Sequence, residues 1–199
     1  PIAVGSVAWR LGAVQRVSVV VKATFGLVND QPARLVAPQE IVVEDRRMQG
    51  LSSLEASAEN APYLPSAGVV LTGHAYAPGG TPTSAMSVRL AVYRDQAIID
   101  KTLHVFGDRN AATAATPQPF VKMPLVWEKA FGGTGVEDNP VGLGAVFGIR
   151  ALPNLVDPGD QRKPACFGPI PRQWVARRRL LGNADPRLLD RATPEMPED

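Results

Sequence analysis

Between Trp127 and Pro171 the chain reads WEKAFGGTGVEDNPVGLGAVFGIRALPNLVDPGDQRKPACFGPIP. The last forty residues of this stretch hold eight glycines and six prolines, a density that excludes a long helix or an unbroken central strand. A disordered linker would lack the large apolar residues that recur here, among them Val141, Phe147 and Leu155. We therefore expect a long loop that is ordered and packed, and such loops usually serve binding or catalysis.

Glycine and proline are also over-supplied in the chain as a whole. The 199 residues suit one domain with a core of its own, and 18 glycines with 19 prolines supply the turns of a many-stranded β protein. The formal net charge is +2, and the longest basic run is the three residues from Arg177 to Arg179. This charge is too small and too scattered to indicate a nucleic-acid partner.

Cysteine content and hydropathy bear on the compartment. Cys166 is the one cysteine, so no intrachain disulfide framework exists, and we expect a cytoplasmic protein. No apolar run approaches the length of a membrane span, and the first residues lack the charged and apolar regions of a signal peptide. We therefore expect no membrane partner.

The N-terminal part carries one clear strand pattern. From Val17 to Val28 every second residue is apolar, which predicts a half-buried strand with its apolar face inside. Asn29-Asp30 has turn chemistry, so a hairpin with residues 33–37 is predicted, and residues 41–43 predict a further short strand. Residues 52–65 follow neither a helical nor a strand period, which indicates an extended connector.

Four more segments predict strands in the middle of the chain: Val69–Tyr76, Met86–Tyr93, Ala97–Phe106 and Phe120–Trp127. The three residues 94–96 connect the second and third segments, which predicts a hairpin. Pro124 confines the last strand to a sheet edge or a bulge. The predicted fold class is all-β, an antiparallel β-sandwich crossed by the long loop.

The sequence predicts one short helix, from about Arg172 to Leu181. Pro171 lies near its start and Gly182 at its end, as helix-terminal preferences require. Trp174 and Arg178 share a face with Leu181, and packing on the sheet is favoured over a groove for an acidic partner. We assign residues 1–182 to one β-rich domain and residues 183–199 to a flexible tail.

No motif indicates a cofactor or a metal. The glycines of residues 142–148 are spaced one residue too widely for a dinucleotide fingerprint and lack the preceding parallel strand. His74 and His104 have no partner at the short spacing of metal motifs. Cys166, next to Phe167, is typical of a small buried residue rather than a nucleophile. We expect neither a cofactor nor a metal site.

Carboxylates leave one enzymatic alternative open. The chain lacks a Gly-x-Ser-x-Gly motif, but Glu128 with Asp108 or Asp138 could form the paired carboxylates of a hydrolase, in a cleft under the long loop. Each carboxylate also suits a structural role in a turn or beside a neighbouring cation. Two carboxylates sharing a concave pocket without a cation would favour the hydrolase, and paired carboxylates would count against it.

A series of ordered blocks resembles a known bacterial family. These blocks are Val20–Phe25, Gly73–Gly80, Val105–Arg109, Met123–Leu125, Ala130–Gly133, Asn139–Gly142, Leu152–Asn154, Phe167–Ile170 and Trp174. The family was first filed as domain of unknown function 2169 and is associated with type VI secretion, where members act as effector adaptors or chaperones. The resemblance spans nearly the whole chain. Asn110 departs from it, because an aromatic residue often follows Asp108-Arg109 closely in relatives, and relatives usually continue beyond Asp199.

The resemblance implies a non-enzymatic adaptor, shortened relative to its family, whose partners are a secreted toxin and the spike-tip protein of the type VI apparatus. It implies no catalytic residue. The candidate partner-binding residues are His74, Tyr76, Arg109, Trp127, Phe131, Asn139, Trp174 and Arg178. A third alternative is a carbohydrate-binding sandwich, which needs exposed coplanar aromatics, and the candidates for these are Tyr63, Tyr76, Tyr93 and Trp127.

Overall fold

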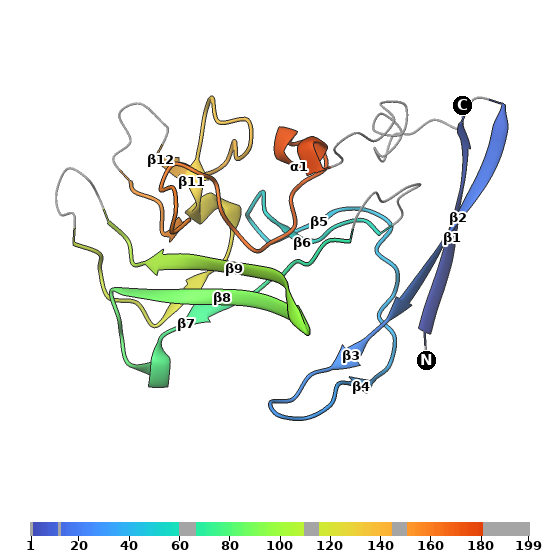
Figure 1. Cartoon of the computed structure of the whole chain (residues 1–199). Helices are drawn as coiled ribbons and strands as arrows, with labels where there is room; N and C mark the ends of the chain where they lie inside the picture. Colours follow the sequence, from blue (N-terminus) through green and yellow to red (C-terminus); the bar gives the residue numbers. More distant parts are fainter. Residues whose placement is uncertain (1, 12, 60–66, 110–115, 145–150, 181–199) are drawn as a thin grey trace.

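The computed structural model of the protein describes residues 2–11, 13–59, 67–109, 116–144 and 151–180. These residues form an all-β fold with one α-helix among them, as the sequence predicts (Figure 1). The strands are β1 (Ile2–Leu11), β2 (Val14–Ala23), β3 (Phe25–Gly26), β4 (Arg34–Leu35), β5 (Arg46–Arg47), β6 (Leu54–Ala56), β7 (His74–Tyr76), β8 (Ala85–Arg94), β9 (Gln96–Phe106), β10 (Lys122–Pro124), β11 (Phe131–Gly132), β12 (Leu143–Gly144) and β13 (Leu155–Val156). The helices are the 3-10 turns η1 (Pro78–Gly80) and η2 (Trp127–Lys129) and the helix α1 (Val175–Leu180).

The hairpin of β8 and β9 is the best predicted element. Arg94 pairs with Gln96 across a tight turn in which Asp95 has φ 58°. Aspartate tolerates this left-handed conformation because its short polar side chain can bond locally. β9 also pairs with β13, so the order of this sheet is β13, β9, β8. The long loop therefore contributes a strand to the central sheet, which the sequence did not predict.

Two sheets share one core. Leu103 and Val105 on β9 are fully buried, and Ala75 of β7 and Met123 of β10 pack into the same cluster. Since side chains alternate along a strand, the remaining face of β7 and β10 points away from this core. β10 pairs with β7 alone, so Pro124 lies on an edge strand as predicted.

Most predicted strands are shorter than their sequence patterns. Of residues 69–76 only His74–Tyr76 form a strand, and of residues 120–127 only Lys122–Pro124. Residues 41–43 do not form a strand, whereas the predicted connector 52–65 contains β6, paired with β5. Many backbone groups here bond to side chains or to loops instead of to a regular ladder: the Val42 N–H, for example, donates to Glu59.

The described parts of the long loop, residues 127–144 and 151–171, are packed, as expected, and they contain short strands. β11 and β12 pair in parallel within it, and β13, further along the chain, pairs antiparallel with β9. The other described strand pairs are antiparallel, as predicted. α1 begins later than predicted because residues 172–174 form a turn in which the Trp174 N–H donates to the Pro171 carbonyl, 3.1 Å away. Leu181, Gly182 and the predicted tail 183–199 lie outside the described residues.

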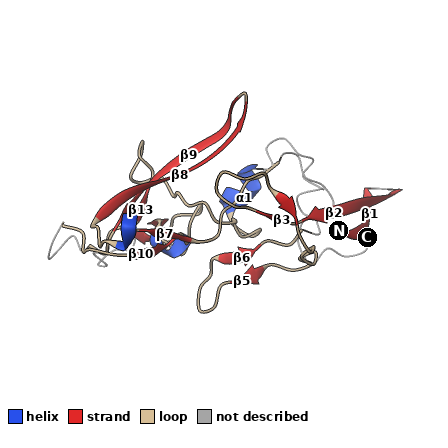
Figure 2. Ribbon diagram, turned by 90° about the horizontal axis from the view of Figure 1, so that it is seen from below, coloured by secondary structure: helices blue, strands red, loops and turns tan. Residues whose placement is uncertain are grey.

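β1 and β2 form a ribbon that projects from the rest of the molecule, away from the sheet of β8 and β9 (Figure 1, Figure 2). Its register runs from Ile2 opposite Ala23 to Leu11 opposite Val14. No sequence pattern predicted β1. The predicted strand 17–28 is interrupted at Thr24, after which β3 and β4 form the expected hairpin in shortened form.

The two faces of the ribbon are the reverse of the prediction. Val17, Val19 and Val21 were expected inside, yet their side chains are exposed. The opposite face, which carries Val20 and Lys22, is half-buried. Its polar groups have partners on the body of the protein: the Lys22 ammonium donates to the Glu40 carbonyl and pairs with the Glu59 carboxylate.

Candidate partner-binding surfaces

Asn139 holds the first turns of the long loop together from inside. Its side chain is fully buried, and its Nδ2 donates to the Trp127 and Phe131 carbonyls, both at 2.9 Å. Gly132 and Gly142 lie so close that a Cβ on either would come within 2.7 Å of the amide nitrogen. Asn139 therefore cannot contact a partner in this structure, and it acts as an internal brace.

Trp127 and Trp174 are also interior residues. Their rings meet edge to face with centroids 5.9 Å apart, and the Trp127 Nε1 donates to the Pro169 carbonyl at 2.9 Å. Both side chains are buried, so they join η2, the loop and the start of α1 instead of offering a surface. Packing of Trp174 on the core is the alternative that the sequence analysis favoured, and it is confirmed.

Arg109 and Phe131 are partly buried. The Arg109 guanidinium stacks 4.1 Å from the centre of the Phe106 ring and donates to the Pro153 carbonyl at 3.0 Å. Desolvation lowers its pKa from the usual value. These contacts tie the end of β9 to the long loop. The side chain of Arg178 lies outside what the structure describes.

Glu128 anchors η2 to the segment before β6. Its Oε1 accepts hydrogen bonds from the Ser52 and Ser53 N–H groups at 2.6 and 2.8 Å, and its Oε2 accepts one from the Ser53 hydroxyl at 2.6 Å. Ser53 is itself buried and accepts a bond from the Trp127 N–H at 2.8 Å. These hydrogen bonds give the Glu128 carboxylate a structural role.

The other two candidate carboxylates are paired. Asp108 accepts hydrogen bonds from the Asn154 amide at 2.9 Å and from Lys129 at 3.1 Å, and these bonds hold its pKa below the usual range. Asp138 forms an ion pair with Arg179. The arrangement that would have favoured a hydrolase, two unpaired carboxylates in one pocket, is therefore not found for these residues.

His74 and Tyr76 form an exposed patch with Lys122 on the outer face of β7 and β10. Their ring centroids lie 6.0 Å apart, and the Lys122 ammonium lies 5.7 Å from the Tyr76 ring centre. Tyr76 is 60% exposed. Desolvation and then the nearby Lys122 charge lower the pKa of His74, which favours its neutral form. Lys122 was not among the predicted partner-binding residues. Because side chains alternate along a strand, its position next to the inward-facing Met123 places it on the outer face.

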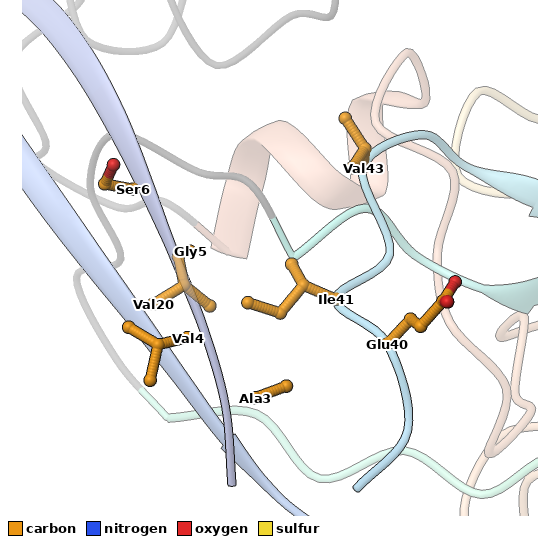
Figure 3. Close-up of a pocket in the computed structure, with 8 residues that line it drawn as sticks. All are labelled: Ala3, Val4, Gly5, Ser6, Val20, Glu40, Ile41 and Val43. Atoms are coloured by element: carbon orange, nitrogen blue, oxygen red, sulfur yellow. The ribbon is translucent and has the colours of Figure 1, made fainter.

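An open cleft of about 430 Å³ lies between the ribbon and residues 40–43 (Figure 3). Ile41 reaches across to the ribbon, and its Cδ1 lies 2.9 Å from where a Cβ of Gly5 would be, so a larger residue there would require the Ile41 side chain to move. Val20 and Val43 add apolar walls, and Glu40 is the one titratable residue among those that line the cleft. The cleft supplies packing surface but no second group for acid–base chemistry.

The sequence was compared with family models, curated proteins and solved structures. Residues 13–199 match the model of a family described as an uncharacterized protein conserved in bacteria, DUF2169. The chain belongs to this family. No curated protein and no solved structure matches this DUF2169 chain. The description of this family names no activity.

Other sites that the sequence suggested can be checked in the DUF2169 chain. Among the described residues, no group of three or more His, Cys, Asp or Glu side chains lies close enough to hold a metal ion. None of the described helices is long and apolar enough to cross a membrane. Of the four aromatics considered for carbohydrate binding, Trp127 is buried and Tyr63 lies outside the described residues, while Tyr76 and Tyr93 lie on different sheets.

Cys166 is buried, as predicted, and we expect it to be unreactive. Its thiol donates to the Leu125 carbonyl at 3.3 Å, and burial raises its pKa to about 11. Since the thiolate is the nucleophile, the native protein should react with a thiol reagent at pH ~8 about two orders of magnitude more slowly than the unfolded chain. Similar rates in the native and unfolded protein would contradict the burial.

Proposed function

We propose that the protein is a non-enzymatic adaptor that binds another protein through the exposed patch of His74, Tyr76 and Lys122. The patch carries this proposal because it presents an aromatic ring, an imidazole and a cation on strands whose other face is packed in the core. Tyrosine is enriched among residues that dominate binding energy at protein interfaces. A preformed patch also binds at low ordering cost.

The second part of the proposal identifies the partner protein. The sequence blocks resemble effector adaptors of type VI secretion, and we propose that the partner is a secreted toxin that the protein helps to load onto the spike-tip protein. The bonding of the three carboxylates fits a role without turnover, because Glu128, Asp108 and Asp138 each have structural hydrogen-bond or ion-pair partners. The test is co-purification of the intact protein with the effector and the spike-tip protein encoded beside it. Recovery of neither would refute the proposal.

Tyr76→Ala should weaken binding to the effector about tenfold or more, because an exposed tyrosine at the centre of an interface contributes at that level. The free energy of unfolding should change little, since Tyr76 points out of the core. Titration calorimetry on the purified pair measures the first effect. Tyr93→Ala is the matched control, because Tyr93 is 59% exposed and lies on the other sheet. Equal loss in both variants would place the interface elsewhere.

A further inference from the structure

One face of the β1–β2 ribbon exposes a row of large apolar side chains. We define the valine face as the outward residues Ile2, Val4, Ser6, Ala8, Val17, Val19, Val21 and Ala23. Its five large side chains are between 55% and 66% exposed, and none of the eight residues is charged. The proposed adaptor patch lies on other strands, so this face calls for a separate explanation.

An apolar sheet face of this kind is normally covered by another layer of protein. A two-stranded ribbon alone is marginally stable in water, and its apolar face needs a further layer. At about 100 Å² of accessible surface for each of the five large exposed side chains, the valine face presents roughly 500 Å² of apolar surface, which is at the upper end of the largest apolar patches of typical monomers. Two such faces packed together would remove about 1,000 Å² from water, which is the size that a specific protein interface needs to reach.

The shape of the valine face suits a second copy of itself. On β2 the valines at 17, 19 and 21 form a ridge, while the residues opposite the first two, Ala8 and Ser6, form a trough on β1. A two-fold axis parallel to the strands places β2 of one copy over β1 of the other, so Val17 and Val19 of one copy lie over the small residues Ala8 and Ser6 of the other, and Val21 lies against Val4. The absence of charge on the valine face means that no like charges meet across such an axis.

We propose that the valine face binds a second copy of this chain, so that two ribbons pack face to face as a four-stranded sandwich. The area matches what a dimer needs, and the ridge and trough make the surface complementary to itself. This inference goes beyond the adaptor function and does not depend on it. The two surfaces are separate, so the dimer leaves the His74, Tyr76 and Lys122 patch open to a partner.

The first test is the mass of the protein in solution. Light scattering after gel filtration should show a concentration-dependent dimer, and Val19→Glu should raise the dimer dissociation constant at least ~100-fold, because it buries an unpaired charge. Ile98→Glu is the matched control, since Ile98 is 62% exposed on β9 outside the ribbon, and it should leave the dimer intact. Equal weakening by both variants would overturn the proposal, as would a wild-type chain that stays monomeric at near-millimolar concentration.

A mixing experiment tests the arrangement and guards against misfolding of one variant. Val19 and Ser6 are paired within the ribbon, so the two-fold axis places Val19 of one copy over Ser6 of the other. Val19→Glu and Ser6→Lys should each be monomeric alone, and their equimolar mixture should form heterodimers that high salt weakens. A mixture that stays monomeric would overturn the ridge-in-trough dimer. If the wild-type protein is monomeric and Val19→Glu abolishes effector binding, the valine face binds the effector and the dimer proposal is wrong.

Discussion

Replacing Gly142 with alanine should destabilise the protein by about 3 kcal/mol or more, a large share of the ~5–15 kcal/mol typical of a folded domain. The new Cβ would lie 2.4 Å from the Asn139 Nδ2, 2.6 Å from the Ala130 carbonyl oxygen and 2.7 Å from the Gly132 Cα. Two of these neighbours are backbone atoms, so no side-chain rotation can relieve the clash. Displacing Asn139 would also cost the hydrogen bonds to the carbonyls it braces.

Denaturant unfolding followed by tryptophan fluorescence measures this effect, because two of the tryptophans, Trp127 and Trp174, sit in the affected region. For a domain of this size, ~3 kcal/mol corresponds to a fall in melting temperature of about 6–12 °C. Gly68→Ala is the control, since nothing lies within 4 Å of its added Cβ and its φ is not positive. That variant should stay within ~0.5 kcal/mol of wild type. A Gly142→Ala protein as stable as Gly68→Ala would show that the loop is not packed as described.

Local signals account for the part of the fold that could be predicted. The β8–β9 hairpin combines strict alternation with a very short connection, and both are properties of neighbouring residues. The long loop was expected to be ordered because its apolar residues need burial, and Leu155 is indeed fully buried. Its strands could not be foreseen, since β13 exists through pairing with β9, about fifty residues earlier.

The β1–β2 ribbon shows that the alternation of apolar residues along a strand does not decide which of its faces is buried. Alternation correctly placed Val17, Val19 and Val21 on one face of a strand, but a period does not say which face is covered. The covered face is chosen by Lys22, which bonds Glu59 across 37 positions of the chain, and by Ile41 seated on Gly5. These are tertiary contacts, and no local pattern reports them.

The candidate site was predicted in part. His74 and Tyr76 were chosen from the sequence and lie together on the surface, whereas Trp127 and Trp174 were chosen as aromatic contact residues and lie inside. Aromatic residues serve both interfaces and cores, and only burial separates the two uses. Asn139 was likewise read as a surface residue, although its partners are carbonyls that the fold brings around it.

Asn139→Asp should be the second severely destabilising change, by about 3–5 kcal/mol near pH 7. The side chain is 0% exposed, and both of its N–H donors are used, on the Trp127 and Phe131 carbonyls. A carboxylate of the same size cannot donate, so it would place a buried negative charge against two carbonyl oxygens. The loop would lose its brace at the point where η2, β11 and β12 meet.

The loss in Asn139→Asp should depend on pH, which distinguishes it from a simple packing defect. Burial against carbonyl oxygens must raise the pKa of the introduced carboxyl above its unfolded value of ~3.9. A group whose pKa is raised on folding favours the fold below the unfolded pKa and opposes it as pH rises. The difference in unfolding free energy between wild type and variant should therefore be smallest at pH ~4 and grow toward pH ~7. Asn29→Asp, in the exposed turn after β3, should show no such trend, and a flat difference in Asn139→Asp would mean that the amide is not buried among carbonyls.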